Sequence, residues 1–164
     1  MIIRDVASSD TKPILDIYNS YIESSVATFE ETIINAFELE HRIEAILKKG
    51  GNWLVADDNG IIRGYAYSSD WHKRSAFRFS TEVSAYLSNA YLSQGVGTAL
   101  YSALFKKIEE NKKHSIIASI TLPNPSSVSL HEKFRMQKVA HLNEVGFKFG
   151  QWLDVGYWQL VLKS

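Results

Sequence analysis

Two glycines, Gly95 and Gly97, stand where an alternating stretch gives way to a helix-forming one, in YLSQGVGTALYSALFKKIEE. Glycine at the start of a helix lowers helix stability by about 1 kcal/mol relative to alanine. Two glycines there indicate that the main chain must be accessible without a Cβ atom. The first N–H groups of a helix have no internal partner, and the helix dipole adds positive charge beside them. A phosphate can reach such groups without meeting a Cβ atom. The pattern therefore predicts either a pyrophosphate cradle or a tight strand-to-helix turn without a ligand.

Two other phosphate-binding motifs do not fit this segment. The Walker sequence G-x-x-x-x-G-K-[ST] is absent, and the dinucleotide fingerprint G-x-G-x-x-G has Leu100 in place of its third glycine. A Rossmann unit also normally begins near the first strand, whereas this turn lies past the middle of the chain. A nucleotide-binding protein of either class is therefore disfavoured.

Glu82 and His131 are the side chains best placed for proton transfer. Glu82 lies on the polar face of the alternating stretch AFRFSTEVSAYL, where apolar surroundings would raise its pKa and suit a base. The alternative is a cross-strand ion pair with Arg74 or Arg78. His131 lies in NPSSVSLHEKF and could both give and take a proton near neutral pH, or could be a solvated helix histidine.

The remaining charged groups give weaker signals. The histidines outside that helix have no spacing typical of a metal site, and they are His41, His72, His114 and His141. The stretch WHKRSAF holds three potentially cationic residues just before the Glu82 strand. Arginine can grip a carboxylate or phosphinate with two parallel hydrogen bonds. This stretch is therefore either an anion-binding loop or an ordinary solvated one.

The composition excludes several classes of protein. The chain has 164 residues, 45% of them hydrophobic and 22% charged, which is typical of one globular domain over residues 1–164. A formal net charge of zero argues against nucleic-acid or anionic-membrane partners, and no apolar run is long enough for a membrane-spanning helix. The absence of cysteine excludes disulfides and thiolate metal sites. MIIRDVASSD has no apolar signal region, so we expect a cytoplasmic location.

Apolar periodicity and turn residues predict an α/β domain. The expected order is strand, two helices, three strands, helix, strand, helix and two strands. Helices are expected over 8–22 (with a Ser or Asp cap), 36–51, the stretch after the glycines, and 124–134 with Asn124 as cap. Strands are expected at the N-terminus, in a 52–69 hairpin closed by Asn59-Gly60, and over 76–87, 115–122, 138–147 and 152–162. Alternation in 76–87 places Phe77, Phe79, Thr81 and Val83 on one face.

Three longer stretches carry a family resemblance: RFSTEVSAYL, TLPNPSSVSLHEKF and GFKFGQWLDVGYWQ. With the glycine turn, they resemble the GNAT superfamily of acetyl-CoA-dependent N-acetyltransferases, and more narrowly its phosphinothricin N-acetyltransferase branch. The resemblance is densest from Arg74 to Gln159. It implies a mixed, mostly antiparallel sheet with helices on both faces and a V-shaped split between VSAYL and SIIASITL. It also implies a homodimer that packs through the aromatic-rich stretch near the C-terminus.

The resemblance also implies roles for individual residues. Acetyl-CoA would be the acetyl donor, no metal would be needed, Glu82 would be the general base, and His131 would have a second acid or base role. A main-chain N–H of the Ala85–Leu87 stretch would polarise the thioester carbonyl. The implied cofactor-binding residues are Ala85, Tyr86, Leu87, Gln94, Gly95, Val96, Gly97, Thr98, Asn124 and Ser127. The implied substrate-binding residues are Phe29, His72, Arg74, Phe77, Tyr86 and Val155.

The sequence departs from the family pattern at several positions. Leu92 stands where the family usually has Arg or Gln, and Arg135-Met136 stands where it has Gly-Phe. His72 replaces a common lysine and Phe77 a common tyrosine, which favours methionine sulfone or sulfoximine over the herbicide phosphinothricin. The sequence thus predicts acetylation of the α-amino group of a small anionic amino-acid analogue. The alternatives are a GNAT enzyme for another primary amine, or an acyl-CoA-binding module without catalytic activity.

Overall fold

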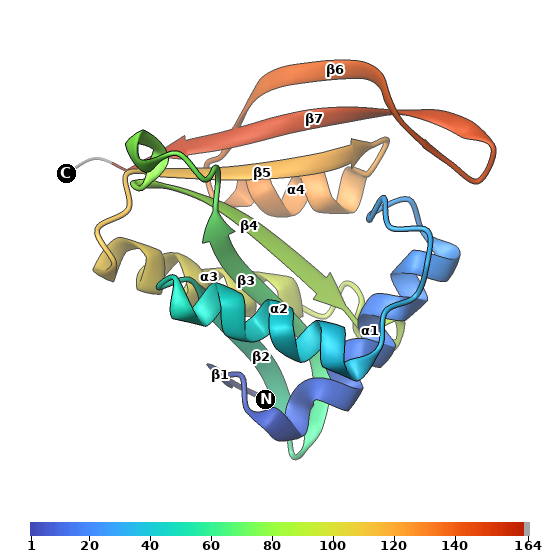
Figure 1. Cartoon of the computed structure of the whole chain (residues 1–164), viewed down its shortest axis with the longest axis vertical. Helices are drawn as coiled ribbons and strands as arrows, with labels where there is room; N and C mark the ends of the chain where they lie inside the picture. Colours follow the sequence, from blue (N-terminus) through green and yellow to red (C-terminus); the bar gives the residue numbers. More distant parts are fainter. Residues whose placement is uncertain (163–164) are drawn as a thin grey trace.

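A computed structural model describes residues 1–162 and has the predicted order of elements (Figure 1). The helices are α1 (Thr11–Ser24), α2 (Ala36–Lys48), α3 (Val96–Glu110) and α4 (Pro125–Lys133). The strands are β1 (Ile2–Asp5), β2 (Asn52–Asp58), β3 (Ile61–Asp70), β4 (Ser80–Leu87), β5 (Ser115–Leu122), β6 (Gln137–Lys148) and β7 (Gln151–Val161).

The strands form one seven-stranded sheet in the order β1-β2-β3-β4-β5-β7-β6. Every neighbouring pair is antiparallel except β4 and β5, which run parallel. That parallel pairing holds at only three positions, from Ser80 opposite Ser115 to Glu82 opposite Ile117. Beyond them β4 continues to Leu87 and β5 to Leu122 without pairing with each other. This divergence is the V-shaped split, and the predicted fold class is confirmed.

The helices cover both faces of the sheet, with α1 and α2 on one side and α3 and α4 on the other (Figure 1). Each face has its own buried core, because every strand between them presents alternate side chains to the two sides. The α3 side is filled by the apolar face of that helix, including Leu100, Tyr101, Leu104 and Ile108. The α1 side contains Ile14, Ile17, Ile22, Leu39, Ile43, Trp53 and Tyr65.

Several element boundaries follow the predicted turn chemistry. Asn59 and Gly60 have φ angles of 53° and 88°, as the hairpin signal requires. Asn124 accepts a hydrogen bond from the Ser127 N–H at 3.1 Å and so caps α4. Arg135 adopts the left-handed φ of 63° at the place where the family pattern has glycine.

The strand expected over 76–87 begins only at Ser80. Residues Ser75–Phe77 form a 3-10 turn instead, and Phe77 and Phe79 are 37% and 49% exposed, whereas Thr81 and Val83 are buried. The prediction that these four side chains share one face was therefore wrong. The reason is that β3 ends at Asp70, opposite Thr81, so the earlier residues have no partner strand to extend along.

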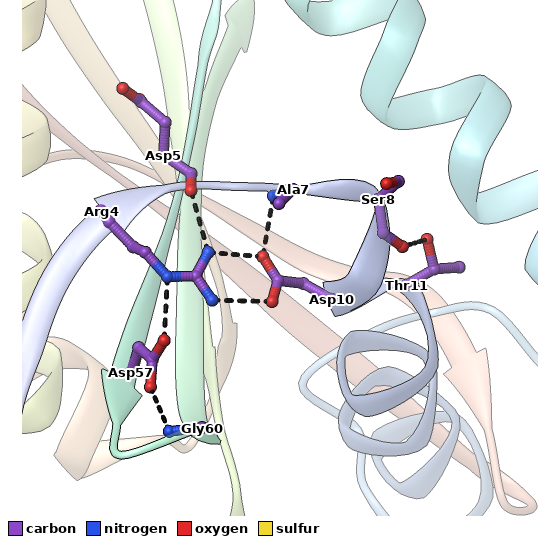
Figure 2. Close-up of polar contacts among 8 residues, drawn as sticks. All are labelled: Arg4, Asp5, Ala7, Ser8, Asp10, Thr11, Asp57 and Gly60. Carbon is purple, nitrogen blue, oxygen red and sulfur yellow. Dashed lines mark hydrogen bonds and ion pairs between the residues drawn. The ribbon is translucent and has the colours of Figure 1, made fainter.

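Arg4 joins three elements near the start of the chain (Figure 2). Its guanidinium donates to both carboxylate oxygens of Asp10, at 2.7 and 2.8 Å, and to Asp57 near the end of β2 at 2.9 Å. Asp10 also accepts from the Ala7 N–H, so it does not cap α1 through its side chain as predicted. The hydrogen bonds from Arg4, and then from Ala7, hold the pKa of buried Asp10 below its usual value.

We predict that Arg4→Met destabilises the fold at neutral pH. Asp10 would lose its charged donors while staying buried, and such hydrogen bonds contribute about 1.5–3 kcal/mol. Because the folded-state pKa of Asp10 is lowered, this stabilisation is present above the unfolded pKa of about 3.9 and is lost as pH falls below it. Urea unfolding of the wild type and the variant, from pH 7 to acid pH, should show the difference between their unfolding free energies shrinking.

Lys12→Met provides the control, because Lys12 pairs with Asp16 at the exposed surface of α1. Its unfolding free energy should change by less than about 0.5 kcal/mol. An equal effect of the two substitutions at pH 7 would contradict the assignment of a structural role to the Arg4 cluster.

Candidate active site

A groove with a volume of about 1170 Å³ opens where β4 and β5 separate. It is bordered by α1, β4, the start of α3, β5 and α4, and it brings together most residues that the resemblance implied for the cofactor. Those lining it are Ala85, Tyr86, Leu87, Gly95, Val96, Gly97, Thr98, Asn124 and Ser127. Gln94 does not line it, and its side-chain amide donates to the Ala90 carbonyl at 3.1 Å.

The second half of β4 presents main-chain groups to this groove. After Ile117, β5 pairs with β7 but no longer with β4. Within residues 1–162, the β4 edge from Val83 onward therefore has no strand partner on that side. An extended ligand can hydrogen-bond to such an edge as an added strand would.

The glycine turn at the start of α3 forms the other end of the groove. Gly95 precedes the helix with a left-handed φ of 80°, and no side chain caps the helix there. The first main-chain bond of the helix runs from the Ala99 N–H to the Gly95 carbonyl, which leaves the earlier N–H groups for an anion. Gly97, which lines the groove, also packs closely against α4, because a Cβ atom there would lie 3.2 Å from the Leu130 side chain.

His131 is buried, with only 5% of its surface exposed, and is not the solvated histidine of the alternative interpretation. Its Nδ1 lies 2.7 Å from the Ser127 carbonyl, which can only accept, so Nδ1 carries the ring proton. Its Nε2 then accepts a hydrogen bond from the Tyr101 hydroxyl at 2.9 Å. Burial lowers the pKa of His131, so the neutral form is favoured at neutral pH.

Tyr101 is a site residue that the sequence analysis missed. It lines the groove from α3, yet it lies within the apolar stripe of that helix and looks like ordinary core. The usable signal is the hydroxyl itself, because a buried tyrosine needs a hydrogen-bond partner. Burial raises the pKa of Tyr101 well above its usual value, so its hydroxyl stays protonated and acts as the donor to His131.

Glu82 is a partly buried carboxylate with no hydrogen-bond or ion-pair partner within residues 1–162. The alternative of an ion pair with Arg78 is excluded, because that guanidinium donates to the Ser75 carbonyl and lies over the Phe79 ring. Arg74 forms no ion pair with Glu82 either. Burial raises the pKa of Glu82 above its usual value, which suits a general base.

The residues implied for substrate binding are not gathered in one cavity. His72, Arg74 and Phe77 line a second cavity of about 670 Å³, between the end of α2 and the β3–β4 loop. Tyr86 lines the groove instead, packed against Tyr21 with ring centroids 5.1 Å apart.

Phe29 and Val155 line neither cavity. The Phe29 ring lies against Gly146 of β6, and Val155 is buried in β7.

Glu82 lies between the two cavities. Its partner in β3 is Ser69, which lines the second cavity, while its neighbour Val83 lines the groove. Burial raises the pKa of both Tyr67 and Tyr101, and the charge of Glu82 adds to the rise in each. Glu82 is therefore within electrostatic reach of the Tyr101 hydroxyl that binds His131.

No group of three or more His, Cys, Asp or Glu side chains in residues 1–162 is arranged to hold a metal ion. In the same part of the chain, no helix has the length and apolar character needed to cross a membrane.

Comparison with known proteins gives consistent matches over nearly the whole chain. A family model described as an acetyltransferase (GNAT) domain matches residues 3–156. A phosphinothricin N-acetyltransferase of Streptomyces viridochromogenes is 36% identical over 96% of this chain and 85% of its own length. An L-methionine sulfoximine/L-methionine sulfone acetyltransferase of Salmonella typhimurium is 32% identical over 99% of this chain and 95% of its own.

Solved structures agree with these relatives. An acetyltransferase from Salmonella typhimurium, solved with its cofactor acetyl-CoA, has a TM-score of 0.96 at 31% identity and covers 99% of this chain and 94% of its own. A phosphinothricin acetyltransferase from Sinorhizobium meliloti in complex with acetyl-CoA has a TM-score of 0.95 at 35% identity, over 98% and 88%. The chain therefore belongs to the GNAT family of acetyltransferases.

Proposed function

We propose that this protein transfers the acetyl group of acetyl-CoA directly to the α-amino group of a small amino-acid-like acceptor. The observation that carries the proposal is Glu82, an unpaired and partly buried carboxylate at the point where the two central strands separate. Phosphinothricin, methionine sulfoximine and methionine sulfone are the acceptors named for the relatives, and we propose this class of acceptor here.

The groove fits acetyl-CoA at both ends. In our proposal the diphosphate lies on the N–H groups at the start of α3, where Gly95 keeps the approach open. The pantetheine arm lies along the free edge of β4 and carries the thioester toward Glu82. Two solved relatives contain acetyl-CoA, which supports acetyl-CoA as the ligand proposed here.

The chemistry requires two proton transfers. An α-amino group has a pKa of about 8 and arrives largely as an ammonium ion. Glu82 accepts a proton from it, directly or through a water molecule, and the freed nitrogen attacks the thioester carbonyl. Main-chain N–H groups of the Ala85–Leu87 stretch stabilise the oxyanion. When the C–S bond then breaks, the proton still in excess on the nitrogen passes to the thiolate of CoA, directly or through a relay, which leaves the amide and free CoA.

The hydrogen bonds of His131 restrict the role it can have in proton transfer. Its one ring proton is held by the Ser127 carbonyl, so the neutral imidazole can accept a proton at Nε2 but has none to give there. We therefore assign His131 the role of acceptor, acting through the Tyr101 hydroxyl that it binds. Both residues line the groove, and the Tyr101 hydroxyl can accept a proton there as it passes its own to Nε2 of His131.

The acceptor class follows from charge. The second cavity has Lys49, His72, Lys73 and Arg74 in its lining against a single carboxylate, Asp70. Such a lining favours an anionic acceptor and disfavours a polyamine. The alternative of a binding module without catalysis gives no reason for an unpaired carboxylate beside the groove.

We also propose that the protein is a homodimer that packs through the β6–β7 hairpin. β6 is an edge strand, and the hairpin exposes a set of large apolar side chains: Val139, Leu142, Val145, Phe147, Phe149 and Trp152. A large exposed apolar surface on an edge strand is typical of a protein–protein interface. The cytoplasmic location stays a prediction.

Glu82→Gln is expected to lower kcat/KM by about 10²–10⁴-fold while acetyl-CoA affinity stays within about twofold, because only the proton acceptor is lost. Release of CoA can be followed with a thiol reagent across a panel of amino acids and their analogues, since the protein has no cysteine of its own. Glu110→Gln, on the exposed end of α3, is the control and should retain wild-type turnover. Full activity of the Glu82 variant would overturn the proposal.

The raised pKa of Glu82 sets two pH dependences. Only the ionised carboxylate is a base, so wild-type kcat/KM should fall as pH drops through that raised pKa, and Glu82→Gln should lack this decrease at acid pH.

Ionised Glu82 has the opposite effect on stability. Because its folded-state pKa is raised, the folded protein favours the protonated form, and ionisation at neutral pH destabilises the fold. Glu82→Gln should raise Tm by about 2 °C or more at neutral pH, with the gain shrinking toward pH 4. Thermal unfolding of both proteins at a series of pH values checks the direction of the Tm change and the pH range over which it disappears.

Trp152→Glu is predicted to break the homodimer, because it places a charge among the exposed apolar side chains of the hairpin next to Phe147. Light scattering after size exclusion should give the mass of one 18.6 kDa chain instead of two. Phe37→Glu is the control, since Phe37 is exposed on α2, away from the hairpin. A wild-type protein that elutes as a monomer at micromolar concentration would refute the dimer.

A further inference from the structure

Lys148, the last residue of β6, is a buried lysine that the chemistry above does not use. Only 1% of its surface is exposed, and it belongs to none of the ion pairs formed within residues 1–162. Burial lowers the pKa of its ammonium group, with Glu31 and Glu30 acting in the opposite direction from a greater distance. An apolar side chain of the same length would fill this space without the desolvation penalty. The ammonium group must therefore do something that methionine could not.

The ammonium group of Lys148 holds the connection between α1 and α2. Its Nζ donates to the Ser25 carbonyl at 2.7 Å and to the Thr28 carbonyl at 2.9 Å, across 123 and 120 positions of sequence. Residues 25–35 contain no helix or strand, so their main-chain groups depend on partners from elsewhere. Figure 1 shows this connection running beside the turn of the β6–β7 hairpin.

A second contact from β6 holds the same segment. The Phe29 ring lies on Gly146, where a Cβ atom would come within 2.3 Å of the ring. Gly146 and Lys148 are two positions apart and so face the same side of the strand. From the helix side, the Tyr18 hydroxyl lies 3.1 Å from the Thr28 hydroxyl and donates to Glu30 at 2.8 Å. Residues 25–30, called here the wall segment, are thus fixed between α1 and β6.

The wall segment borders the groove. Ser25 and Ala27 line it directly, following Ser20, Tyr21 and Ser24 at the end of α1. Phe29 continues the same segment toward β6. The width of the groove on this side therefore depends on where the segment is held.

We propose that Lys148 is a positioning residue that fixes the wall segment, and through it the geometry in which donor and acceptor meet. It touches neither the reacting atoms nor Glu82 and His131. Because the wall segment borders the groove proposed for acetyl-CoA, loss of Lys148 should weaken acetyl-CoA binding more than it slows the chemical step. The acetyl-CoA part of this inference rests on the proposed function, whereas the fixing of the wall segment does not.

Lys148→Met is the direct test, because it keeps the length of the side chain and removes the donor. The KM for acetyl-CoA should rise about tenfold while kcat stays within about threefold. Amide hydrogen exchange of residues 25–30 should become at least about tenfold faster, and that of α3 should not change. Lys138→Met, at an exposed position of the same strand, should leave all these quantities unchanged.

Gly146→Ala perturbs the same segment while leaving Lys148 intact, and it keeps the question open to test if Lys148→Met fails to fold. The added methyl group must displace the Phe29 ring, so the same rise in KM and in exchange is expected. A lowered Tm with unchanged KM and unchanged exchange of 25–30 in either variant would overturn the inference. A wild-type protein that acetylates no amine would refute the proposed function, and the exchange data would still decide the role of Lys148.

Discussion

The separation of β4 from β5 after only three paired positions is the constraint on which the site depends. Had the two strands stayed paired to Leu87 and Leu122, the main-chain groups of β4 would be used within the sheet and no groove would open. Each hydrogen bond left unmade there forgoes about 0.5–1.5 kcal/mol, which a ligand lying along the strand can restore. The same separation opens a groove that is lined by Tyr101 and His131. A split sheet thus supplies both a binding edge and access to these two side chains.

Burial acts on the two candidate catalytic groups in complementary directions. It raises the pKa of Glu82 and lowers that of His131, so in both cases the neutral form is favoured. His131 has a hydrogen bond at each ring nitrogen, whereas the carboxylate of Glu82 has no partner within residues 1–162, and an uncompensated buried group lowers the stability of the fold. Stability has to come from elsewhere, and the paired Arg4 and Asp10 show the opposite arrangement, in which every charge has a partner. This difference indicates that the paired Arg4 and Asp10 serve stability, whereas the shifted pKa values of Glu82 and His131 are consistent with a catalytic role.

The sequence allowed the element order, the glycine turn and the positions of Glu82 and His131 to be predicted, because each depends on local patterns. Alternating side chains, helix-capping residues and glycines are patterns that depend only on neighbouring residues, so they predict local structure. Tyr101 was missed because its partner lies 30 positions away, on another helix. The start of β4 was misplaced because it is set by where β3 ends. Gly97 lines the groove, but its contact with Leu130 was not predicted, because that contact depends on how two helices pack. Each miss is a long-range contact that a single stretch of sequence does not record.

The geometry of β6 shows why its register matters more than that of an ordinary edge strand. Successive side chains alternate between faces, so Gly146 and Lys148 can contact the wall segment only while Phe147 between them points away from it. This phase is fixed by the pairing of Gly146, Phe147 and Lys148 with Leu153, Trp152 and Gln151 of β7. The register is irregular between Leu142 and Gly146, where Asp154 of β7 accepts a hydrogen bond from the Glu144 N–H at 2.8 Å. A slip of one residue across Gly146–Lys148 would turn the lysine away from the wall segment and place Phe147 against it. The contacts to the wall segment and the exposed face that contains Phe147 therefore depend on the same register of β6 against β7.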